Sequence, residues 1–199
     1  MPERCGWFGF ERNRAQMTKV FCIGLNKTGT TSLGDALQTL GMSRSGWSLQ
    51  AAEFTLCWHE KRFPDEIVQV VEKYDCFEDL PWPLYFEELD KRNPDARFIL
   101  TTRKTDDAWL RSIQGHIERI ENWVGHFLIY GSYDPESDAK KYMKKYQEHN
   151  AAVRAYFSSK PDRLLDIHIE EANWLTLCEF LGCPCPDLPF PHSNKGTPA

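Results

Sequence analysis

Short apolar runs recur along the chain after its first 18 residues. Val20–Ile23 is a continuous apolar run that ends at Gly24, and Arg97–Thr102 is a second run of this kind. Runs of this length suit strands that are buried on both faces of a parallel sheet. Similar but weaker patterns at 75–79 and 164–167 predict two more strands.

The segments between these runs carry apolar residues at helical spacing. After the first strand the repeating positions are Leu33, Ala36, Leu37 and Leu40, and Gly41 is a suitable stop. A later stripe consists of Trp109, Ile113, Ile117 and Ile120. Further helices are expected at 65–73, 84–91, 138–158 and 174–181. Strands that alternate with helices predict an α/β fold, with a parallel sheet flanked by helices on both faces.

Length and charge narrow the possible functions. The chain has 199 residues, which suits a single domain; we expect residues 1–18 to be an N-terminal extension and residues 19–199 to be the domain. The formal net charge of −5 disfavours a nucleic-acid partner. No apolar run is long enough to span a bilayer, so no membrane span is expected. The sequence leaves the oligomeric state open.

The cysteines indicate a reducing compartment. There are seven, an odd number, and most lie within apolar runs; charged residues interrupt the first segment, where a secretory leader would be apolar. We therefore expect a cytoplasmic protein with free thiols. No metal site is expected, because Cys183-Pro-Cys185 is too tight for zinc and Cys57-Trp-His59 has no second pair.

The segment between the first strand and its helix, residues 24–32, has the composition of a phosphate-binding loop. Glycines let the backbone turn its N–H groups toward an anion, and the helix N-terminus adds unpaired donors and a partial positive charge. The simpler alternative is a Gly/Thr-rich turn that caps the helix. The residues predicted to contact an anion are Asn26, Lys27, Thr28, Gly29, Thr30, Thr31 and Ser32.

The position of the lysine separates this loop from the Walker A loop of ATP-binding proteins. Walker A places lysine directly after the second glycine, in G-x-x-x-x-G-K-[ST], whereas Lys27 lies two residues before Gly29. Asp79 and Asp166 follow or end predicted strands and could hold magnesium. A small-molecule kinase that uses ATP and magnesium therefore stays open as an alternative.

The order Lys27-Thr-Gly-Thr-Thr-Ser32 resembles the 5′-phosphosulfate loop of P-loop sulfotransferases, and residues 21–34 are similar to a small bacterial-type branch of that superfamily. The resemblance implies a P-loop-type fold and the co-substrate 3′-phosphoadenosine-5′-phosphosulfate (PAPS), with no metal. It implies that Lys27 is catalytic and stabilises charge on the leaving phosphate. The reaction implied is sulfuryl transfer to a hydroxyl or amine of a small-molecule, lipid or glycan acceptor. A relative that kept the fold and lost activity is a further alternative.

A second strand and helix extend the resemblance. Arg103 at the strand end and Ser112 on the following helix match the residues that bind the 3′-phosphate in sulfotransferases. Their spacing is one residue longer than in many relatives, so Arg111 could share the role. Alternatively, Arg103 and Ser112 are ordinary polar residues at a helix start.

The resemblance also implies a catalytic base. Asp79 precedes Leu-Pro where cytosolic sulfotransferases often have His-Leu-Pro, with the histidine as base. A carboxylate can accept a proton in the same way. Alternation along a strand turns the adjacent Glu78 to the opposite side. Alternatively, Asp79 caps the next helix or orders the Pro81–Pro83 turn. His59 and His116 are weaker candidates for the base.

The remaining functional residues are less defined. Lys195 near the C-terminus either reaches the nucleotide or lies in a solvated tail. The acceptor pocket is expected to be built from variable loops at residues 42–64 and 121–137. Their aromatic residues suggest an apolar or flat acceptor, although aromatic residues also line ordinary cores. Possible stacking partners for adenine are Trp47, Trp82 and Trp109.

Overall fold

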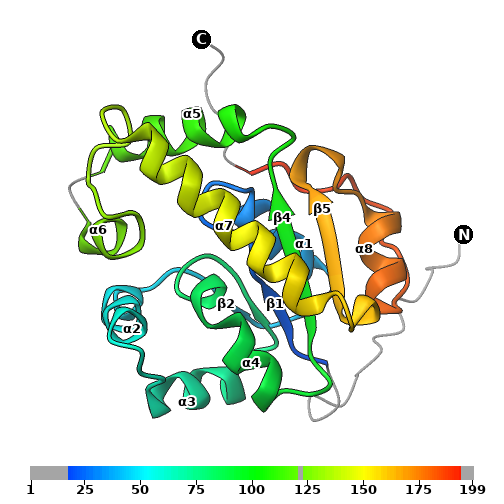
Figure 1. The fold of residues 1–199 in the computed structure, drawn as a ribbon. Coiled ribbons are helices and arrows are strands. Elements are labelled where there is room, and N and C mark those ends of the chain that lie inside the picture. Colours follow the sequence, from blue (N-terminus) through cyan, green and yellow to red (C-terminus); the bar gives the residue numbers. More distant parts are fainter. Residues whose placement is uncertain (1–17, 121–122, 194–199) are drawn as a thin grey trace, which may run out of the picture.

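A computed structural model of the chain describes residues 18–120 and 123–193. Its centre is a five-stranded sheet in the order β2-β3-β1-β4-β5, in which every pair is parallel (Figure 1). The strands are β1 (Val20–Cys22), β2 (Arg44–Ser45), β3 (Cys76–Phe77), β4 (Arg97–Thr102) and β5 (Leu164–His168). The predicted α/β fold with a parallel sheet in a single domain is confirmed.

Helices occupy most of the segments between the strands. They are α1 (Thr30–Thr39), α2 (Gln50–His59), α3 (Asp65–Lys73), α4 (Phe86–Arg92), α5 (Asp106–Ile117), α6 (Val124–Tyr130), α7 (Ala139–Phe157) and α8 (Trp174–Leu181). Short 3-10 turns lie at Trp82–Tyr85, Pro161–Arg163 and Ile169–Glu171.

Alternation along β1 divides the core into two layers. Val20 and Cys22 pack with residues of α1 and α8 on one face of the sheet. Phe21 points to the other face, where it meets residues of α3, α4 and α7. In Figure 1, α7 crosses the near face of the sheet and α1 lies behind it. Helices therefore cover both faces, as the alternation of elements predicts.

A third apolar cluster lies beyond the carboxyl ends of the strands. The indole of Trp109 on α5 is fully buried there and stacks on Tyr146 of α7, with ring centroids 4.2 Å apart. Its Nε1 donates a hydrogen bond to the Asn26 carbonyl at 3.0 Å. This contact fixes α5 against the loop that follows β1.

Three expectations from the sequence are wrong. The segments 42–64 and 121–137 are not simply loops, since they contain β2, α2 and α6. The five-residue strand expected at 75–79 pairs only over Cys76–Phe77. Ile120 does not join the buried stripe of its helix, because α5 ends at Ile117 and Ile120 is 37% exposed.

The order of the strands defines where a ligand can bind. β1 leads along the chain to β2 on one side of the sheet, and β4 leads to β5 on the other. Adjacent parallel strands whose connections diverge leave a crevice at their carboxyl ends. Within residues 18–120 and 123–193, no helix has the length and hydrophobicity of a membrane span.

Candidate active site

A cavity of about 960 Å³ opens at this crevice. Its walls come from the loop after β1, the ends of β3 and β4, the helix α5 and the start of α6. Pockets for nucleotide-sized ligands fall in this range of volume.

The loop after β1 has a tightly determined backbone. Lys27 and Gly29 both adopt left-handed conformations, with φ of 68° and 86°. A side chain at Gly29 would meet Ile169 at 2.1 Å, and one at Gly24 would meet the Thr101 carbonyl oxygen at 2.3 Å. The buried Thr28 hydroxyl donates to the Leu25 carbonyl at 2.7 Å. The loop therefore turns directly into the N-terminus of α1.

Lys27 presents the central cation of the cavity. The residue is partly buried, and among the described residues its ammonium has no hydrogen-bond or ion-pair partner. Burial lowers the pKa of Lys27, the positive charge of Arg119 lowers it further, and Asp79 opposes the shift. A cation held without a counter-ion at a helix N-terminus is suited to an anionic ligand.

Three arginines add to this positive charge. Arg103 donates from Nε to the Lys27 carbonyl at 3.0 Å and from Nη1 to Glu170 at 3.1 Å. Arg111 on α5 and Arg119, just after the end of that helix, line the cavity, and neither forms an ion pair with a described residue. The described lining thus holds four cationic side chains and one carboxylate, in a chain whose net charge is −5.

The single carboxylate belongs to Asp79, which follows β3. Its backbone is left-handed, with φ of 65°, and its Oδ1 accepts a hydrogen bond from the Leu80 N–H at 2.8 Å. Burial raises the pKa of Asp79 to about 6, and the adjacent Glu78 adds to the rise, while the Leu80 N–H and Lys27 oppose it. Glu78 does not line the cavity and instead pairs with Arg44, which agrees with the alternation expected from the sequence.

Two histidines lie in the wall beyond Lys27. Burial lowers the pKa of His116 and of His126 to about 4, with Lys27 adding to the shift at His116. Both are therefore neutral near pH 7. The Asn26 amide nitrogen donates to His126 Nε2 at 3.4 Å, and the Tyr130 hydroxyl donates to Asn26 Oδ1 at 2.5 Å. The Asn26 side chain thus holds the loop against α6.

Aromatic and aliphatic side chains form the outer wall. Trp47 is 54% exposed and lines the cavity together with Ile120 and Trp123. Two of the tryptophans considered for adenine stacking are excluded, because Trp82 and Trp109 are buried in the core. Only Trp47 of the three faces the cavity.

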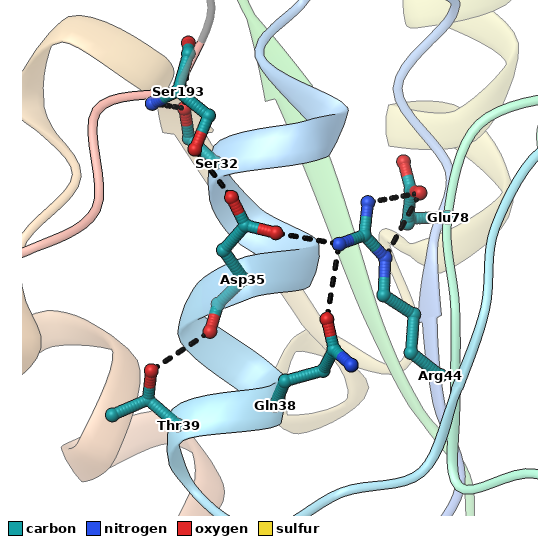
Figure 2. A network of polar contacts seen from close by, with 7 residues as sticks. All are labelled: Ser32, Asp35, Gln38, Thr39, Arg44, Glu78 and Ser193. Atoms are coloured by element: carbon teal, nitrogen blue, oxygen red, sulfur yellow. Dashed lines mark hydrogen bonds and ion pairs between the residues drawn. The ribbon is translucent and has the colours of Figure 1, made fainter.

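The C-terminal segment closes the side of the cavity next to α1. The Ser193 N–H donates to the Ser32 hydroxyl at 2.9 Å, as Figure 2 shows. Ser193 also lines the cavity. Lys195, predicted to reach the nucleotide, lies outside the described residues.

The cavity gathers most of the residues selected from the sequence. Thr28 does not line it, because its hydroxyl is used inside the protein. Asp166, considered as a magnesium ligand, is held by Arg154 at 2.6 Å and is not part of the lining. The predicted residues that line the cavity are Asn26, Lys27, Gly29, Thr30, Thr31, Ser32, Asp79, Arg103 and Ser112.

Sequence reasoning missed Arg119 and Ser193, and gave no role to His126. The position of Arg119 could have been predicted, because Ser112 and His116 on one face of α5 are continued at helical spacing by Arg119, two residues past the end of the helix. The face that carries Ser112 therefore predicts the next cavity residues. The position of Ser193 could not be predicted in this way, because it depends on a hydrogen bond to Ser32, which is 161 residues away in the sequence.

Three similarities to known proteins bear on this site. The profile of a family described as Sulfotransferase domain matches residues 19–135 and 127–198. A protein of Aspergillus versicolor, Ava biosynthesis cluster protein M, is 27% identical over an aligned length of 212 positions. The alignment covers 87% of this chain and 80% of that protein. The crystal structure of a sulfotransferase from Alicyclobacillus acidocaldarius has a TM-score of 0.56 at 16% identity, covering 91% of this chain and 86% of that one. The last match is a likeness in fold.

Proposed function

The chain belongs to the sulfotransferase domain family, and we propose that it transfers a sulfuryl group from PAPS to a hydroxyl or amine of a small molecule. One observation carries the proposal. The cavity brings an unpaired lysine ahead of a tight glycine, at the N-terminus of α1, together with a carboxylate whose pKa is raised. An anion-binding loop and a proton acceptor on one cavity are what sulfuryl transfer requires.

The charges of the cavity fit a nucleotide that is anionic at two places. Lys27 and the backbone N–H groups at the start of α1 suit the phosphosulfate. Arg103 and Ser112 suit the 3′-phosphate, because a guanidinium can bind two phosphate oxygens and a hydroxyl can add a third bond. Arg111 lies beside Ser112 on α5 and also lines the cavity, which supports a shared role.

PAPS supplies an activated sulfuryl group when it is bound. The chain's own residues then do three things. Asp79 accepts the proton of the attacking hydroxyl or amine as the bond to sulfur forms and the bond between sulfur and the phosphate oxygen breaks. Lys27 and the loop N–H groups stabilise the charge that grows on the leaving phosphate. The side chains of Trp47 and Trp123, which line the outer wall, provide apolar surface for the acceptor.

A pKa of about 6 suits this role for Asp79. At pH 7 the carboxylate is mostly ionised and can accept a proton, and it is a stronger base than an ordinary aspartate. Asp79 is thus matched to the reaction by burial and by the charge of Glu78.

The acceptor is proposed to enter along the outer wall. Trp47, Ile120 and Trp123 offer apolar, flat surface to a small molecule. The relative from Aspergillus versicolor is named for a biosynthesis cluster, which supports a small-molecule acceptor.

We place the protein in the cytoplasm, because all six cysteines in the described part of the chain are unpaired.

Calorimetry tests the nucleotide. Adenosine 3′,5′-bisphosphate, the product of PAPS, should bind more tightly than ATP with magnesium, and the preference should weaken in Arg103→Met. Tighter binding of ATP with magnesium would favour the kinase alternative and overturn the proposal.

Turnover is tested by supplying PAPS with a panel of phenols, alcohols and amines and measuring release of the bisphosphate. Lys27→Ala should abolish release. Lys104→Ala is the matched control, because Lys104 is an exposed lysine that pairs with Glu171 outside the cavity lining. Tight bisphosphate binding without release on any acceptor would show a relative that has lost activity.

A further inference from the structure

We propose that Arg44 and Glu78 are positioning residues, forming a buried ion pair that holds Asp79 against the phosphate loop and sets its charge state. The inference rests on the proposed role of Asp79 as the base. Neither Arg44 nor Glu78 lines the cavity, so both act through a neighbour.

The guanidinium of Arg44 contacts the Glu78 carboxylate closely, through two of its nitrogen atoms. Arg44 on β2 donates to Glu78 Oε1 from Nη2 at 2.5 Å and from Nε at 3.1 Å. The Glu78 side chain is 4% exposed and that of Arg44 is 17% exposed. A buried pair of this kind contributes little net stability, since both charges lose water, so its presence calls for another explanation.

The guanidinium also reaches the helix that carries the phosphate loop. Nη1 of Arg44 donates to Asp35 Oδ1 at 2.6 Å and to Gln38 Oε1 at 3.1 Å, both on α1 (Figure 2). One side chain thus connects α1, which begins at the loop of Lys27, to the end of β3, which is followed by Asp79. The two halves of the proposed reaction centre are fixed to each other by this arginine.

Two glycines make room for the pair. A side chain at Gly34 would meet the Arg44 guanidinium at 2.5 Å, and a side chain at Gly46 would meet Glu78 Oε1 at 2.5 Å. The other carboxylate oxygen of Glu78, Oε2, is buried and has no hydrogen-bond partner among the described residues. An unpaired buried oxygen is costly, and it keeps part of the negative charge of Glu78 uncompensated next to Asp79.

The charged groups around Asp79 act in opposite directions. Glu78 on the same strand end raises its pKa, whereas Lys27 on the loop and Arg44 on β2 lower it. Burial raises the pKa of the Tyr130 hydroxyl on α6, and Tyr142 and the charge of Asp79 add to the rise. Among the described residues, removing the charge of Glu78 therefore takes away the one neighbouring charge that favours protonation of Asp79.

The experiment is an NMR titration of the aspartate carboxyl carbons in the protein without nucleotide, with the Asp79 signal identified from Asp79→Asn. The wild-type midpoint should lie near pH 6. Glu78→Gln keeps the shape of the side chain and removes its charge, so the Asp79 midpoint should fall by about one pH unit. The matched control is Gln38→Ala, which removes an uncharged partner of the same guanidinium and should leave the midpoint unchanged.

A midpoint that stays in place in Glu78→Gln, or that moves equally in Gln38→Ala, overturns the inference. A second measurement covers loss of folding. Arg44→Met should lower the thermal midpoint more than the double variant Arg44→Met/Glu78→Met, because only the single variant leaves Glu78 buried without its partner. Equal losses would contradict the ion pair. The proposed function fails separately, if the wild type does not bind adenosine 3′,5′-bisphosphate.

Discussion

The phosphate loop and the wall formed by α5 and α6 face one cavity, but their residues reach it by different routes. The loop is a contiguous stretch whose shape follows from local features, the left-handed Lys27 and Gly29 and the missing side chain of Gly24. The wall is assembled from two helices that are held in place by the buried aromatic cluster around Trp109. Local geometry thus shapes the loop, whereas packing between distant segments shapes the wall opposite it.

The largest expected effect comes from the contact that joins the two regions. Trp109→Ala should lower the free energy of unfolding by about 3–5 kcal/mol, because it removes a fully buried ring that stacks on Tyr146 and bonds to the loop. Chemical denaturation measures this loss. Trp109→Phe keeps most of the stacking and should cost about 1 kcal/mol through the lost N–H bond. A loss below 1 kcal/mol in the alanine variant would show that the regions are anchored independently.

The next effect isolates the loop. Lys27→Met should reduce transfer by about 10²–10³-fold, since it removes a preorganised charge at the developing anion. The free energy of unfolding should stay the same or rise slightly, because a partly buried charge without a counter-ion is removed. Initial rates and denaturation curves on the same sample separate the two quantities. A stability loss that matches the rate loss would indicate that the lysine supports the fold instead.

The pH dependence of the rate tests the role of the Asp79 carboxylate, which lies opposite the loop. The base must be ionised, so the rate should be flat above about pH 7 and should fall about tenfold per pH unit below 6. The free energy of unfolding should change with pH in the direction opposite to the rate. Because the pKa of Asp79 is raised from 3.8 to about 6 on folding, the protonated form is favoured in the folded state, and this contribution is lost as pH rises through that window.

Asp79→Asn is the reference for both measurements. It should lose the acid limb of the rate profile together with most of the activity. The difference in unfolding free energy between the wild type and Asp79→Asn should change between pH 4 and 6. A rate profile that is identical in the two proteins would remove Asp79 from the reaction.

The smallest effect concerns the outer wall. Trp47→Ala should raise the KM for an aromatic acceptor by about 3–10-fold and leave bisphosphate affinity unchanged, because Trp47 is 54% exposed and offers only part of its surface. Leu49→Ala is a suitable control, since Leu49 is 87% exposed and is not among the cavity residues. Weaker bisphosphate binding in Trp47→Ala would instead indicate that this ring stacks on adenine.

The contrast between local features and distant contacts explains how much of the structure could be predicted from the sequence. Buried parallel strands appear as apolar runs, and the loop of Lys27 lies in one stretch of nine residues, so the fold and much of the cavity lining could be predicted. The helix α2 was missed because it lacks a clear apolar stripe; its buried positions include Thr55. The roles of Arg44 and Ser193 depend on partners 34 and 161 residues away, and such contacts leave no local pattern.

The excess of positive charge in the cavity has a practical consequence at the bench. Lys27, Arg103, Arg111 and Arg119 surround one carboxylate, and this arrangement will attract any tetrahedral oxyanion. Phosphate buffers and ammonium sulfate are therefore competitors, and affinities measured in them would be too weak. Dialysis into chloride at low ionic strength should precede every titration.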